Sequence, residues 1–81
     1  MGRAMPYNGK KLHKYMQSSQ AEFEVRGNYI YKYMSASQPV YEIRGDYIHK
    51  YMSASQPVYE IRGGRYVHEY MRATQPVYEL R

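Results

Sequence analysis

Residues 27–62 read GNYIYKYMSASQPVYEIR followed by GDYIHKYMSASQPVYEIR, two stretches of eighteen residues that differ at two positions. More divergent copies flank them at 9–26 and 64–81, and Gly63 is a single extra residue between the third copy, 45–62, and the fourth. A fixed period of this kind is typical of repeat architectures. The sequence therefore predicts one repeat domain over 9–81, preceded by an N-terminal extension over 1–8.

Each copy contains two short segments rich in Tyr, Ile and Val, such as 29–34 and 39–44. Gly27-Asn28 or Gly45-Asp46 separates successive copies, and a Ser/Ala/Gln segment separates the two halves of a copy. Short β-prone segments between turn residues are typical of hairpins, and Gly readily takes the positive φ of a two-residue hairpin turn. We predict an all-β fold, an antiparallel meander of about eight strands built from four β-hairpin repeats. A β-solenoid is the alternative, because its coils also accept an eighteen-residue period.

The two kinds of turn set the predicted register of the strands. A two-residue loop at Gly45-Asp46 places Ile43 opposite Ile48, and a four-residue loop at 35–38 places Ile30 opposite Ile43. This sheet has no stagger, because each residue aligns with its equivalent 18 positions on. A closed barrel needs a stagger, so the pairing predicts a sheet that must be covered by something else.

A single open layer would leave both of its faces wet, and a chain of this size is marginally stable without further burial. We therefore expect a homo-oligomer, with a dimer favoured, and the last strand at 76–81 is a candidate for pairing with a second copy. Another protein is the other candidate partner. The residues expected to mediate self-association are Ile30, Met34, Tyr41, Ile43, Ile48, Met52, Tyr59, Ile61, Tyr78 and Leu80.

The opposite face is predicted to carry rows of tyrosine with arginine between them. Its candidate interaction residues are Tyr29, Tyr33, Arg44, Tyr47, Tyr51, Arg62, Tyr66 and Tyr70. Bases stack on aromatic rings while Arg holds phosphate, so a nucleic-acid-binding sheet is the alternative function. Glu42 and Glu60 on the same face oppose phosphate binding, and tyrosine is also simply a good sheet residue.

His13, His49 and His68 recur at one repeat position and raise the question of a metal site. Equivalent residues of a meander lie two strands apart, roughly 10 Å, which is too far to share one ion. We expect instead a cross-strand hydrogen-bonded row made of His13, Glu24, Tyr31, Glu42, His49, Glu60, His68 and Glu79. The sequence has no cysteine, phosphate-binding loop or nucleophile elbow, so we expect no enzyme, no metal and no cofactor.

The net charge of +5 is concentrated at the N-terminal end, where residues 1–26 hold five Lys/Arg and two Glu. The repeated body is nearly neutral, so charge gives only a weak nucleic-acid signal. No apolar run approaches the ~20 residues of a membrane helix, and no signal peptide is recognisable. We expect a cytoplasmic protein with no membrane partner that serves as a non-enzymatic structural or protein-interaction module.

Overall fold

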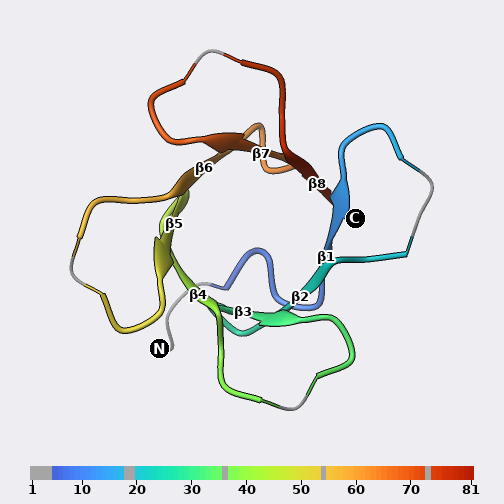
Figure 1. Cartoon of the computed structure of the whole chain (residues 1–81), viewed down its shortest axis with the longest axis vertical. Helices are drawn as coiled ribbons and strands as arrows, with labels where there is room; N and C mark the ends of the chain where they lie inside the picture. Colours follow the sequence, from blue (N-terminus) through green and yellow to red (C-terminus); the bar gives the residue numbers. More distant parts are fainter. Residues whose placement is uncertain (1–4, 18–19, 36, 54, 73) are drawn as a thin grey trace.

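The computed structural model describes residues 5–17, 20–35, 37–53, 55–72 and 74–81. These residues form eight strands, and Figure 1 shows the strands arranged in a ring. The strands follow one another in chain order, and each pairs antiparallel with its two neighbours, β8 with β1. Their bounds are β1 Lys11–Lys14, β2 Phe23–Arg26, β3 Tyr29–Lys32, β4 Tyr41–Arg44, β5 Tyr47–Lys50, β6 Tyr59–Arg62, β7 Tyr66–Glu69 and β8 Tyr78–Leu80. The predicted all-β antiparallel meander is confirmed, and it closes into a barrel.

The turns between repeats have the predicted form. Ile43 lies opposite Ile48 across the β4–β5 turn, and Gly27 and Gly45 have φ of 64° and 63°. A side chain at these positions would strain the turn, which explains the glycine. The β6–β7 turn accommodates the extra residue as a three-residue loop, 63–65, between Arg62 and Tyr66.

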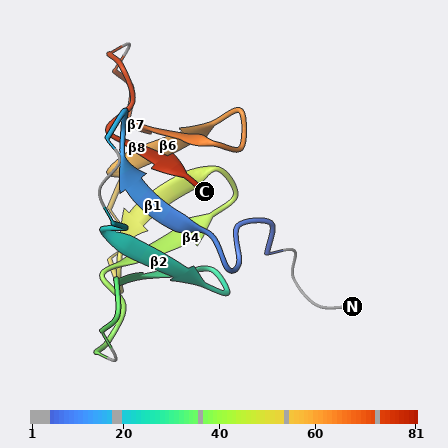
Figure 2. The ribbon, with the colours of Figure 1, turned by 90° about the vertical axis from the view of Figure 1, so that its right-hand side faces the viewer.

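The register predicted within each repeat is wrong by two residues. Ile30 pairs with Tyr41 rather than Ile43, and the backbone N–H of Val40 donates to the carbonyl of Ile30 at 2.8 Å. The physical reason is that the end of β3 remains bonded to the preceding repeat. Lys32 lies opposite Phe23, and the backbone N–H of Tyr33 donates to the carbonyl of Glu22 at 3.1 Å. The chain therefore leaves the barrel as a wide loop, and Figure 2 shows these loops flaring from one end of the barrel.

This two-residue shift closes the sheet, so the prediction of an unstaggered, uncovered sheet is wrong. The shift recurs in each repeat, and two residues per repeat over four repeats give a shear of eight. An eight-stranded barrel with this shear has strands tilted by about 36°. At the seam, Leu12 pairs with Leu80 and Lys14 with Tyr78. The free edge predicted at 76–81 therefore does not exist in the barrel.

The interior is filled by side chains in layers from alternate strands, as expected for this barrel geometry. The buried aliphatic residues are Leu12, Val25, Ile30, Ile43, Ile48, Ile61, Val67 and Leu80, one from each strand. Four aromatic residues pack against them towards the loop end: Phe23, Tyr41, Tyr59 and Tyr78. The core is thus complete within one chain.

The N-terminal extension contributes to this core, and Figure 2 shows its described residues, in dark blue, at the end of the barrel opposite the loops. Tyr7 is buried, and its hydroxyl donates to the carboxylate of Asp46 at 2.7 Å. The side-chain oxygen of Asn8 accepts a hydrogen bond from the backbone N–H of Gly27, also at 2.7 Å. Residues 7 and 8 therefore cap the turn end of the barrel. Residues 1–4 of the extension lie outside the described residues.

Candidate functional site

Six positions are identical in all four repeats. The structure gives some of them a structural role, and the others are candidates for a functional role. In the second repeat they are Gly27, Tyr33, Met34, Gln38, Glu42 and Arg44. The glycine makes the turn between repeats. The structure accounts for three more of these positions, and the methionine and glutamine remain.

The arginine and glutamate hold each loop to the repeat before it. Arg44 donates to Glu42 at 3.2 Å and to the carbonyl of Ser53, in the next loop, at 3.3 Å. The same arrangement recurs in every repeat, and Arg81 closes the ring by donating to the carbonyl of Gln17 at 3.4 Å. Arg44 and Arg62, which were predicted to serve an interaction face, therefore both make loop-holding hydrogen bonds.

The invariant tyrosine anchors the start of each loop. The backbone N–H of Tyr51 donates to the carbonyl of Val40 in the preceding repeat, and its ring lies edge-on to Tyr29 with centroids 5.9 Å apart. Tyr70 packs on Tyr47 in the same way, also at 5.9 Å. The structure therefore brings the predicted tyrosines together in pairs on the outside of the barrel.

The remaining members of the predicted tyrosine rows have other neighbours. Tyr66 packs edge-on against Tyr15 at 6.0 Å, which adds an aromatic contact across the seam between the last and first repeats. Tyr33 lines a pocket of about 380 Å³ at the junction of the first two repeats, together with Phe23 and Lys32. A second pocket, of about 300 Å³, lies at the junction of the last two repeats.

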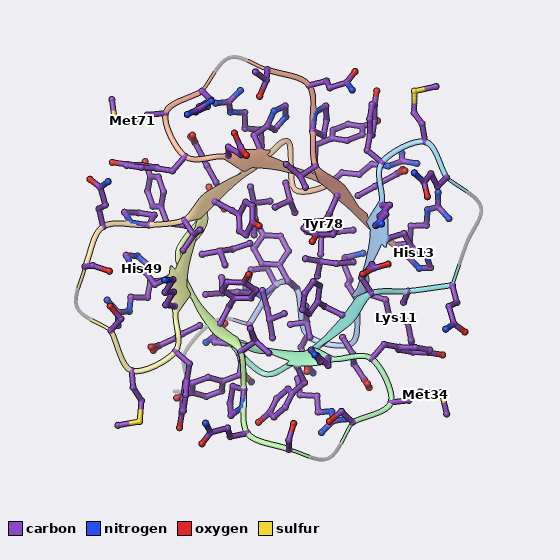
Figure 3. The ribbon with its side chains drawn as sticks, viewed as in Figure 1. Lys11, His13, Met34, His49, Met71 and Tyr78 are labelled. Atoms are coloured by element: carbon purple, nitrogen blue, oxygen red, sulfur yellow. The ribbon has the colours of Figure 1, made fainter. Side chains whose placement is uncertain are left out.

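The invariant methionines have no such packing role. Met16, Met34, Met52 and Met71 are each 79–82% exposed, and their φ values of 58–61° lie in the left-handed region. Figure 3 shows Met34 and Met71 projecting outward at the loop periphery. A residue with a Cβ pays about 1–2 kcal/mol in this conformation, and Gly or Asn is the usual choice. Exposed side chains at strained positions in all four copies mark these loops as the candidate functional site.

The invariant glutamines lie on the same loops. Gln20, Gln38, Gln56 and Gln75 are all exposed, and their side chains make no hydrogen bond to another described residue. Gln20 and Gln56 line the two pockets at the repeat junctions. We call the invariant methionines and glutamines together the loop rim.

The face predicted to self-associate is divided by barrel closure. Ile30, Ile43, Ile48, Ile61 and Leu80 lie in the interior. Tyr41, Tyr59 and Tyr78 pack partly buried against this core, whereas Met34 and Met52 are exposed on the loop rim. Sequence reasoning did not single out Met16, Met71 or the glutamines, although their identity in all four copies was a visible signal.

Four aromatic residues form a closed ring near the loop end of the barrel. Phe23, Tyr41, Tyr59 and Tyr78 contact one another edge-to-face with centroids 5.7–6.0 Å apart. Burial, the neighbouring Tyr59 and a hydrogen bond to it raise the pKa of Tyr41 to about 12. Burial also raises the pKa of Tyr59 and of Tyr78. The tyrosine hydroxyls of this ring therefore stay protonated at neutral pH.

The predicted row of histidine and glutamate is interrupted by the two-residue shift. Glu42 lies opposite His49 on one side, as predicted, but opposite Tyr29 on the other. His49 donates from Nδ1 to the carbonyl of Ser55 at 3.2 Å, and His68 does the same to Thr74 at 3.1 Å. Among the described residues, no group of three or more His, Asp or Glu side chains is placed to hold a metal ion.

Comparison with protein-family models, curated proteins and solved structures found no match to this chain. The part of the chain that the structure describes contains no helix long and apolar enough to cross a membrane.

Proposed function

We propose that this protein is a non-enzymatic interaction module that uses a rigid barrel to present its loop rim to a protein surface. The observation that supports the proposal is the set of four identical methionines, highly exposed and held in a left-handed conformation. A flexible, polarisable thioether packs well on varied apolar surfaces, which suits methionine to binding. The strain makes sense if the side chain is needed for contact, because a glycine would relieve it.

A second copy of the chain is one candidate occupant of the loop rim. The barrel buries its own core, so association is not needed to cover the aliphatic residues. Self-association would then depend on exposed residues such as Met34 and Met52 rather than on Ile30 or Ile48. This difference makes the dimer expectation testable with surface variants that leave the core intact.

The test is photo-crosslinking with a diazirine analogue incorporated in place of methionine. In the wild-type protein we expect crosslinks from the loop methionines either to a second copy, seen as a dimer band, or to a defined partner protein. A variant with Met16, Met34, Met52 and Met71 replaced by alanine retains Met1 and Met5, so it serves as the matched control. Alanine keeps the Cβ and the backbone strain, so this variant should remain folded.

The result shows whether the crosslinks come from the loop methionines or from Met1 and Met5. Loss of the crosslinks in the four-alanine variant, with unchanged circular dichroism, supports recognition through the loop rim. Crosslinks of equal yield in both proteins would arise from Met1 or Met5 and would contradict the proposal. Light scattering on the same samples identifies whether the crosslinked species is a dimer.

A further inference from the structure

Three lysines surround the barrel mouth at the loop end. Lys14, Lys32 and Lys50 are the last residues of β1, β3 and β5, and each follows a buried interior residue by two positions. Side chains two apart along a strand point to the same face, so these lysines begin on the inner side of the barrel. They are exposed, and none makes an ion pair with another described residue.

The aromatic ring forms the floor beneath these lysines. Lys32 lies opposite Phe23, Lys50 opposite Tyr41, and Lys14 pairs across the seam with a third member of the ring. Figure 3 shows Tyr78 inside the ring of strands. The tyrosine hydroxyls hydrogen-bond one another, Tyr41 with Tyr59 and Tyr59 with Tyr78, so at most one hydroxyl proton is left to donate to an anion above them.

The spacing allows the three ammonium groups to meet one ligand. Alternate strands lie about 10 Å apart. Each lysine carries a flexible four-carbon stem with three N–H donors at its end. Side chains of this length from three consecutive odd-numbered strands can converge above the centre of the mouth.

The other charged groups at the mouth do not cancel the positive charge of the three lysines. Glu69 takes the fourth lysine position but pairs with Arg72 at 3.5 Å. Glu22 lies near enough to Tyr78 to contribute to the rise in its pKa. Three lysines and Arg72 against Glu22 and Glu69 leave two net positive charges.

We infer that the barrel mouth binds a phosphate dianion, with Lys14, Lys32 and Lys50 as the cationic ligands above the tyrosine floor. The charge of the mouth matches that of the dianion, and lysine binds phosphate well as a point charge. The 380 Å³ pocket that Lys32 and Phe23 line opens beside the mouth and has room for the organic part of a phosphate monoester. This inference is independent of the loop rim function.

The test is a titration of the full chain with inorganic phosphate and with phenyl phosphate at constant ionic strength, followed by two-dimensional ¹H–¹⁵N NMR. We expect saturable shifts centred on Lys14, Lys32 and Lys50. The double variant Lys32→Gln with Lys50→Gln should weaken binding by about tenfold or more, since hydrogen bonds to charged groups are strong. The control, Lys10→Gln with Lys11→Gln, removes the same charge away from the mouth and should change affinity less than about twofold.

A gain-of-function variant provides the converse measurement. Glu69→Lys restores the residue of the other three repeats and should tighten phosphate binding by about tenfold. Tighter binding of phenyl phosphate than of inorganic phosphate would identify the ligand as a monoester, and the opposite order would identify free phosphate. Equal weakening by the mouth and control pairs, or no saturable shift with either compound, would overturn the inference.

Discussion

Replacing the strained methionines with glycine should stabilise the protein. Met34 has a φ of 61° and is 81% exposed, so its removal relieves backbone strain and sacrifices almost no burial. The strain is about 1–2 kcal/mol for a residue with a Cβ, and the greater freedom of glycine in the unfolded chain offsets about 0.4–1 kcal/mol of this. We therefore expect Met34→Gly to raise the free energy of unfolding by about 0.5–1 kcal/mol.

The four sites lie on separate loops, so their effects should add. The variant with all four glycines should gain about 2–4 kcal/mol, and each kcal/mol raises the Tm of a domain of this size by about 4–8 °C. The assay is urea denaturation followed by circular dichroism, with thermal melting as a second measure.

Met34→Ala is the matched control, because it removes the same apolar side chain and keeps the Cβ. Its stability should lie close to that of the wild type. If Met34→Gly is no more stable than Met34→Ala, the left-handed backbone is not strained, and the methionine carries no cost that a binding role would have to explain. Greater stability together with lost crosslinking in the glycine variants would be the expected trade-off between stability and function.

Other predictions concern the core and the titrating groups. Ile30, which is 0% exposed, should lose about 2–5 kcal/mol of unfolding free energy as Ile30→Ala in the same urea assay, and a loss as small as that of Met34→Ala would contradict the barrel core. A hydrogen bond from Arg65 is the main cause that lowers the pKa of Glu79 below 4.5, so this contribution is present above about pH 4.5 and is lost as the pH falls through the folded pKa. Arg65→Gln should therefore flatten the acid side of the stability profile, and an unchanged profile would contradict the pairing. The raised pKa of Tyr41, about 12 against 10.0 in the unfolded chain, makes stability fall between pH 10 and 12. Tyr41→Phe should reduce that alkaline loss in melts across this range, and an equal loss would contradict burial as the cause.

We propose that stability and recognition depend on different repeat positions. Gly27, Glu42 and Arg44 and their equivalents make the turns and hold the loops. Met34 and Gln38 have no such role towards the described residues. Variants of the first group are expected to test the fold, whereas variants of the second group test binding.

The period of eighteen residues and the turn chemistry were enough to predict the strands, their order and their antiparallel pairing. Local rules governed these features, since glycine permits the positive φ of the turn and β-prone residues alternate between two faces. The pairing of Ile43 with Ile48 across Gly45 was therefore predicted correctly. The invariant methionines were equally visible in the sequence, but their exposure and φ values were not.

The tertiary structure decided the closure of the sheet. Pattern alone did not distinguish Ile30 opposite Ile43 from Ile30 opposite Tyr41, because a two-residue shift keeps every side chain on the same face. The choice depends on hydrogen bonds between repeats, such as that from Tyr33 to Glu22, which hold the end of β3 away from its own hairpin. The small shift accumulates around four repeats until β8 meets β1, so a difference of two residues separates an open sheet from a closed barrel with its own core.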